Sequence, residues 1–199
     1  MSAVRMILLL TALLACTGAL HRLDAQGQLS GRVSWRGAPA GDAVVELIPD
    51  DGAPPPAVPD TLFIDQLHLR FTPGVLGIPV GSAVEFHNSD QIMHNVFSPE
   101  RRGDDFDLGT YPTGESRYHV FDRAGSFVVL CHVHPEMAAW IVVSASPWVA
   151  ATDGEGRFHL TDVPPGRYRL VGWYRRRVVH DVQVRIVEGQ DTLDVEMGR

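Results

Sequence analysis

Three side chains that bind soft metal ions stand close together in the second half of the chain. Cys131, His134 and Met137 form the pattern Cys-x₂-His-x₂-Met directly after the apolar run SFVVL. A thiolate and an imidazole are strong copper ligands, and a thioether adds a weak, long contact. Two histidines, one cysteine and an axial methionine make up the copper site that transfers single electrons. The pattern therefore predicts a copper site that still needs a second histidine.

The cysteine count agrees with a metal-bound thiol. The chain has two cysteines, Cys16 and Cys131. If Cys16 is cleaved away or lipidated, the exported protein retains one thiol with no internal partner. A lone thiol is vulnerable in an oxidising compartment. We therefore expect Cys131 to be buried, paired between chains or occupied by a metal.

The N-terminal segment is typical of an export signal. Arg5 precedes the apolar run MILLLTALLA at residues 6–15, which is short for a membrane span. Two processing routes remain open: a signal peptide at 1–25, or a lipoprotein signal at 1–15 that leaves a lipid anchor on Cys16. Both predict a periplasmic or secreted protein, in the second case a membrane-anchored lipoprotein. No later apolar run approaches the length of a transmembrane span.

The composition describes an acidic globular protein. Hydrophobic residues make up 45% of the chain, charged residues 21%, and the formal net charge is −7. All 17 basic residues are arginine. A nucleic-acid role is disfavoured, because phosphate binding needs a concentrated basic surface.

The elements that must position these ligands read as strands. From Gln28 onward, short apolar runs alternate with polar residues between turns rich in Gly, Pro and Asp, which predicts an all-β sandwich or barrel. The strands expected around the ligand loop comprise 82–88, 116–121, 126–132 and 138–145. Residues 50–59 are a Pro-rich linker that cannot join a central sheet.

The run FTPGVLGIPVGSAVEFHNSDQIMHNVFS, taken with the compact Cys-x₂-His-x₂-Met loop, is similar to the plastocyanin and amicyanin branch of the cupredoxins. The resemblance covers residues 59–146 and implies a Greek-key β-sandwich that binds one type 1 (blue) copper. It supplies the second histidine, 37 residues before the cysteine. The implied metal ligands are His94, Cys131, His134 and Met137.

The same resemblance implies roles for neighbouring residues. Asn95 is expected to tie the two ligand loops together. His134 is expected to be the electron port, within an apolar patch that includes Met93, Val133 and Pro135.

The segments on either side carry a different resemblance. GRVSWRGAPAGDAVVEL and TDGEGRFHLTDVPPGRYRLVGWY are similar to the two halves of a carboxypeptidase-regulatory-like, transthyretin-like β-sandwich. Here about ninety residues separate the halves, and exposed loop tips tolerate such insertions. We expect a small β-sandwich from 26–58 and 147–199, with the cupredoxin domain at 59–146 inserted into it. The alternative is one cupredoxin with elaborated ends.

Other side chains near the pattern are expected to have structural roles. By strand alternation, His132 faces away from Cys131, and His87 packs. Glu136 lies inside the loop, but the spacing of Met137 matches a ligand better.

Three functions compete. The favoured one is a one-electron carrier, not an enzyme, whose partner is a redox protein such as a c-type cytochrome or a dehydrogenase. The second is a non-redox copper-binding or surface-binding protein. The third, a copper oxidase or nitrite reductase, needs an additional copper with an open position.

Overall fold

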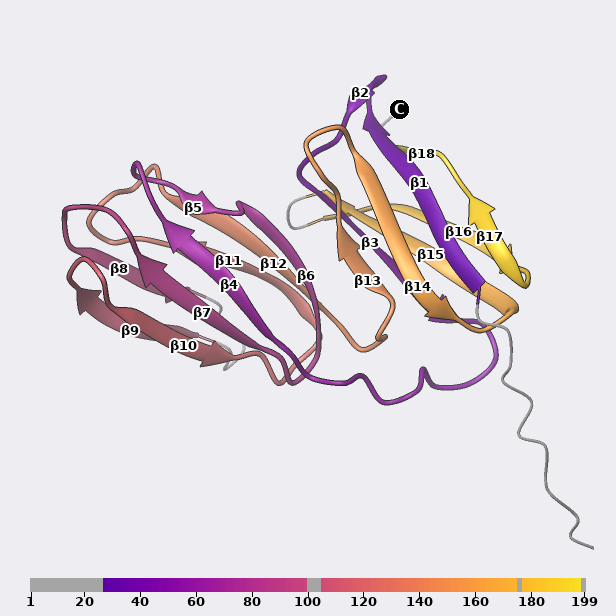
Figure 1. Ribbon diagram of the computed structural model, residues 1–199, viewed down its shortest axis with the longest axis horizontal. Helices are drawn as coiled ribbons and strands as arrows, with labels where there is room; N and C mark the ends of the chain where they lie inside the picture. Colours follow the sequence, from indigo (N-terminus) through magenta and orange to yellow (C-terminus); the bar gives the residue numbers. More distant parts are fainter. Residues whose placement is uncertain (1–26, 100–104, 175–176, 198–199) are drawn as a thin grey trace, which may run out of the picture.

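The described part of the chain is built from strands and turns. The computed structural model describes residues 27–99, 105–174 and 177–197, and no helix occurs within these ranges (Figure 1). The predicted all-β class is confirmed. Because the described residues contain no helix, they include none that is long and apolar enough to cross a bilayer. The predicted export signal, including Cys16, lies outside the described residues.

The strands β4 to β12 form one sandwich, here called the central sandwich. Its sheets have the orders β10-β7-β4-β5 and β6-β12-β11-β8-β9. The pairs β4–β7 and β6–β12 are parallel, and the other neighbours are antiparallel. The strand bounds are β4 Thr61–Gln66, β5 Phe71–Thr72, β6 Val75–Pro79, β7 Ala83–Asn88, β8 His94–Ser98, β9 Phe106–Tyr111, β10 Ser116–Val120, β11 Gly125–Leu130 and β12 Ala138–Ser144.

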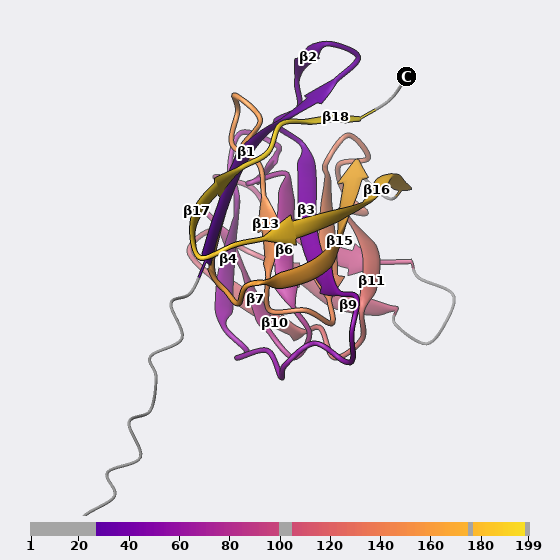
Figure 2. The same ribbon diagram turned by 90° about the vertical axis from the view of Figure 1, so that its right-hand side faces the viewer.

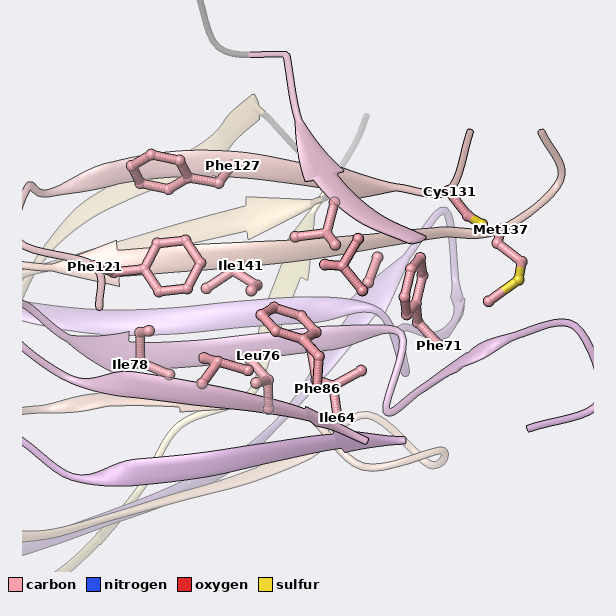
Figure 3. Close-up of a cluster of buried hydrophobic side chains, with 14 of the residues drawn as sticks. Ile64, Phe71, Leu76, Ile78, Phe86, Phe121, Phe127, Cys131, Met137 and Ile141 are labelled. Atoms are coloured by element: carbon pink, nitrogen blue, oxygen red, sulfur yellow. The ribbon is translucent and has the colours of Figure 1, made fainter. Parts of the chain in front are cut away.

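Alternating side chains build the core of this sandwich. In β7, Val84 and Phe86 point inward and are fully buried, whereas the alternate residues Ala83, Glu85 and His87 are partly exposed. The two buried side chains meet inward side chains of the opposite sheet, including Ile141 of β12 and Phe127 of β11 (Figure 3). Removing this apolar surface from water is the main force that holds the two sheets together. The same core ends at Cys131 and Met137, so it reaches the predicted ligand loop.

The remaining strands form a second sandwich, here called the flanking sandwich. One sheet has the order β13-β3-β15-β16, and the other has β14-β1-β17, with β2 and β18 also paired to β1 (Figures 1 and 2). It has its own buried cluster, which includes Leu47, Leu170 and Met197. The strand bounds are β1 Gly27–Trp35, β2 Ala38–Pro39, β3 Ala43–Pro49, β13 Val149–Ala151, β14 Arg157–Val163, β15 Gly166–Tyr174, β16 Arg177–Ile186, β17 Gly189–Thr192 and β18 Val195–Met197.

The two sandwiches pack against each other through a small apolar contact. Val44 of β3, Val75 of β6 and Val142 of β12 are its buried members. Gly77 of β6 makes the close approach possible, because a Cβ built there would lie 2.8 Å from Cγ1 of Val44 and 2.9 Å from Cγ2 of Val149. Any side chain at position 77 would push the sheets apart.

Both chain connections between the sandwiches leave the central one at the same end. The segment from the flanking sandwich enters β4 at Thr61, and β12 leaves at Ser144. The parallel register pairs Thr61 with Ala83 at this end and Gln66 with Asn88 at the other. The loops after β7 and β11, which carry the predicted ligands, lie at the end away from the connections (Figure 1).

Candidate metal centre

Neighbouring strands bring three predicted ligands together. His94 is the first residue of β8, and Cys131 follows the last residue of β11. These strands are adjacent, with Leu130 paired to Phe97. His134 returns from the loop between β11 and β12. One potential ligand atom from each of His94, Cys131 and His134 lies within 4.8 Å of those of the others.

The distances among these atoms suit a single metal ion. The Cys131 Sγ lies 3.9 Å from Nδ1 of His94 and 3.9 Å from Nδ1 of His134, and the two Nδ1 atoms are 3.0 Å apart. The point in the plane of the three atoms that is equidistant from them would lie about 2.1 Å from each, which matches a metal–imidazole bond and is about 0.2 Å shorter than a metal–thiolate bond. The donor triangle therefore has the size that an ion bound in its plane requires.

The fourth predicted ligand is buried at the same place. Met137 is 1% exposed, and its N–H donates to the carbonyl of His134 at 3.0 Å, which closes the loop into a tight turn. The sulfur atoms of Cys131 and Met137 lie together at one end of the core, beyond Phe71 (Figure 3). A set of two imidazoles, a thiol and a thioether favours copper over hard cations.

A carboxylate orients the imidazole of His94, whose side chain is fully buried. Nε2 of His94 lies 2.9 Å from Oδ2 of Asp90, so this nitrogen donates its proton to the carboxylate and leaves the Nδ1 lone pair facing Cys131. Partial burial opposes ionisation of Asp90, but hydrogen bonds from the Leu69 N–H, His94 and the His68 N–H hold the pKa of this carboxyl below its usual value.

Asn95 links the two ligand-bearing segments, as the family resemblance implies. Its N–H donates to Cys131 Sγ at 3.5 Å, and its Oδ1 accepts the N–H of His132 at 3.3 Å. Its Nδ2 donates to Oδ1 of Asp107 at 2.6 Å. The Gly109 N–H is the main cause that holds the pKa of the Asp107 carboxyl below its usual value; burial opposes the shift, and Asn95 and His132 add to it.

The two histidines and the cysteine of this site differ in exposure. His94 and Cys131 are buried, whereas His134 is half-buried and is the donor that reaches the surface. The expected patch members around it, Met93, Val133 and Pro135, are all exposed. Ile92, which the sequence reasoning missed, is 45% exposed and extends the apolar surface.

His132 and His87, which were expected to have structural roles, make structural contacts. His132 is exposed and stacks on Phe97, with ring centroids 3.5 Å apart. Nδ1 of His87 lies 2.9 Å from Oγ of Ser116. Glu136 is exposed. Sequence reasoning missed Asp90 and Asp107. For Asp90 the only available signal was its proximity to His94 within an Asp- and Asn-containing turn.

One named protein is similar in sequence to part of this chain. No family model matches the chain. The chain is 32% identical over 80 residues to the methylamine utilization protein MauL of Methylorubrum extorquens AM1, a match that covers 40% of this chain and 70% of that protein.

Solved structures similar to this chain include copper proteins. One is a purple cupredoxin from Nitrosopumilus maritimus (28% identity, 42% of this chain and 99% of that chain, TM-score 0.38). A second is a Cu(I) form of an amicyanin variant (20% identity, 42% and 82%, TM-score 0.40). A third is the copper-containing nitrite reductase of Thermus scotoductus SA-01 (26% identity, 50% and 25%, TM-score 0.40).

Proposed function

We propose that this chain, which belongs to the family of the methylamine utilization protein MauL, is a type 1 copper protein that carries single electrons. One observation carries the proposal: the buried thiol of Cys131 lies 3.9 Å from Nδ1 of His94 and from Nδ1 of His134. Buried thiol, paired imidazoles and a buried thioether are the donor set of a blue-copper site.

The proposed ligands differ in how strongly they would bind the ion. When bound, copper would supply a one-electron couple between Cu(I) and Cu(II). Cys131 as thiolate and the Nδ1 atoms of His94 and His134 would be the strong ligands, and the thioether of Met137 would be the weak one. β8 and β11 are fixed by sheet pairing and by Asn95, so the donors keep one arrangement. A fixed arrangement limits the reorganisation that opposes electron transfer.

Electrons are proposed to enter and leave through His134. This half-buried residue is the proposed ligand nearest to solvent, and exposed apolar side chains surround it. The surface suits a small, transient contact with a redox protein such as a c-type cytochrome or a dehydrogenase. Because the relative is named for methylamine utilization, an amine-oxidising dehydrogenase is a candidate partner. The flanking sandwich leaves this surface open, since both connections leave from the opposite end.

We propose a carrier and not an enzyme, because Met137 would supply a fourth ligand in place of the open position that a catalytic copper keeps for substrate. The enzyme alternative predicts more than one copper per chain. The non-redox alternative predicts copper binding without a reversible one-electron wave.

Location and domain limits are also proposals. We infer that the N-terminal segment exports the protein to the periplasm or beyond the cell, through a signal peptide at 1–25 or a lipoprotein signal ending before Cys16. The domain limits proposed are 59–146 for the cupredoxin domain, with 26–58 and 147–199 forming a carboxypeptidase-regulatory-like sandwich around it.

The test is to load the purified mature protein with Cu(II). We expect one copper per chain, an intense blue thiolate-to-copper absorption band and a reversible one-electron wave in voltammetry. Cys131→Ser should abolish the band, whereas the matched loop variant Glu136→Gln should retain it. Copper that binds to wild type and Cys131→Ser alike, without the band, would overturn the proposal.

A further inference from the structure

The carboxylate of Asp90 is a junction between the proposed copper site and a neighbouring turn. Its Oδ1 accepts the N–H of His68 at 2.8 Å, and its Oδ2 accepts the N–H of Leu69 at 2.9 Å and the Nε2–H of His94 at 2.9 Å. The backbone N–H of Asp90 donates to Oδ1 of Asn88 and to the carbonyl of Gln66, both at 3.0 Å, and these bonds fix the backbone of Asp90. The carboxylate is thus held in one place relative to both structures that it joins.

The turn that Asp90 holds has an unfavourable backbone. His68 and Leu69 have φ of 54° and 59°, and neither is glycine. Two backbone hydrogen bonds between Leu67 and Arg70, of 3.0 and 3.2 Å, close this two-residue hairpin between β4 and β5. Turns with positive φ at both central positions favour Asn-Gly, because a side chain at left-handed φ is sterically disfavoured. Asp90 offsets this cost by accepting both central N–H groups.

We propose that Asp90 is a positioning residue that fixes the tautomer and orientation of His94 toward copper and couples that imidazole to the turn at 67–70. The inference rests on the proposed copper site. An acceptor at Nε2 requires the proton there, which leaves the lone pair on Nδ1, the atom that faces Cys131 and His134. A carboxylate behind a ligating imidazole also makes it a stronger donor. A stronger donor stabilises Cu(II) more than Cu(I), so Asp90 lowers the reduction potential of the bound copper.

The variant Asp90→Ala removes the carboxylate from both partners, and it could fail simply because the turn unfolds. A second background separates the two effects. His68→Asn with Leu69→Gly gives the turn the residues that its backbone favours, so the hairpin no longer depends on Asp90. Asp90→Ala in that background tests the positioning of His94 alone. Glu136→Gln is the control, because it removes one negative charge from the ligand loop without removing a hydrogen bond to a ligand.

The first readout uses the copper-free protein. NMR of the imidazole nitrogens should show His94 with its proton on Nε2 and slow exchange with water, and Asp90→Ala should speed that exchange at least tenfold. An Nε2 proton that exchanges equally slowly in both proteins would overturn the inference. This readout needs no copper, so it separates failure of the positioning role from failure of the proposed function.

The second readout is the copper-loaded protein. In the background that carries His68→Asn and Leu69→Gly, we expect Asp90→Ala to reduce the preference for Cu(II) over Cu(I) about tenfold. This change raises the one-electron potential by about 59 mV. Copper affinity should fall by roughly 10- to 100-fold, the range for second-sphere partners of metal ligands. Glu136→Gln should shift both quantities much less. Equal shifts in the two variants would reduce the effect to net charge and overturn the inference.

Discussion

The hydrogen bond between Asn95 and Asp107 should account for a measurable share of the stability of the central sandwich. Asn95 is 2% exposed. Its Nδ2 donates to the Asp107 carboxylate at 2.6 Å, and its Oδ1 accepts the N–H of His132. Asn95→Ala removes both side-chain hydrogen bonds. Asp107→Ala removes the first of them and the bond from the Gly109 N–H.

The structure allows the cost to be estimated. A hydrogen bond to a charged group contributes about 1.5–3 kcal/mol and a neutral one about 0.5–1.5 kcal/mol. Because the Asp107 side chain is 55% exposed, we take the low end for the charged bond. Asn95→Ala should therefore cost about 2–3 kcal/mol of the free energy of unfolding, and Asp107→Ala, which loses two bonds to the carboxylate, about 3 kcal/mol. The double variant loses the shared bond once, so it should cost about 1–1.5 kcal/mol less than the two single effects together.

The assay is urea unfolding of the copper-free protein at pH 7, followed by circular dichroism. The control pairs Asn95→Ala with Asp153→Ala, which removes a turn carboxylate that accepts the Glu155 and Arg157 N–H groups in the flanking sandwich. That pair should be additive to within about 0.5 kcal/mol. Equal additivity for Asn95 and Asp107 would refute the reasoning, because it would mean that their hydrogen bond contributes no net stability.

Two further predictions concern other buried groups. Trp173→Phe removes the indole N–H that donates to Oε1 of Glu46 at 2.8 Å. Because Glu46 is 6% exposed, we expect the free energy of unfolding in urea to fall by about 2–3 kcal/mol. Adding Glu46→Leu to this variant should restore part of that loss. A loss below about 0.5 kcal/mol would contradict this account. Burial lowers the pKa of His119, which stacks on Phe106, although Asp122 opposes the shift. The neutral imidazole therefore favours folding above about pH 6.5, and this contribution is lost as the pH falls. His119→Phe should flatten the decline of the unfolding midpoint between about pH 6.5 and 5, and an unchanged slope would exclude this role.

Alternation of apolar and polar residues was sufficient to predict many of the strands. The expected strands at 82–88 and 138–145 correspond to β7 at Ala83–Asn88 and β12 at Ala138–Ser144. The prediction works because each strand buries one face, and a period of two residues is visible in the sequence. The parallel pairing of β4 with β7 was not predictable in this way, since register depends on contacts between distant segments.

The same distinction between local pattern and long-range contact applies to the candidate site. Cys131, His134 and Met137 lie on one loop, so their spacing alone indicated a shared ion. His94 needed the family resemblance, because its approach to Cys131 depends on the pairing of β8 with β11. The only signal for Asp90 was its proximity to His94 in a polar turn, and that signal is weak. An aspartate in a polar turn is common, and its role follows only from the position of the Leu67–Arg70 hairpin beside it.

The arrangement of the two sandwiches follows from where the chain enters and leaves the central one. Asp60 accepts the N–H of Ala83, and Ser144 accepts the N–H of Val80, so entry, exit and the turn before β7 are tied together at one end. Because β12 runs from the ligand loop to this end, the chain cannot enter the flanking sandwich without first moving away from the donors. The contact at Gly77 then packs the flanking sandwich against the outer face of the sheet that contains β6 and β12. A partner can therefore reach His134 without displacing the flanking sandwich, and a bulky side chain at position 77 should alter the packing of the sandwiches and leave the donor distances unchanged.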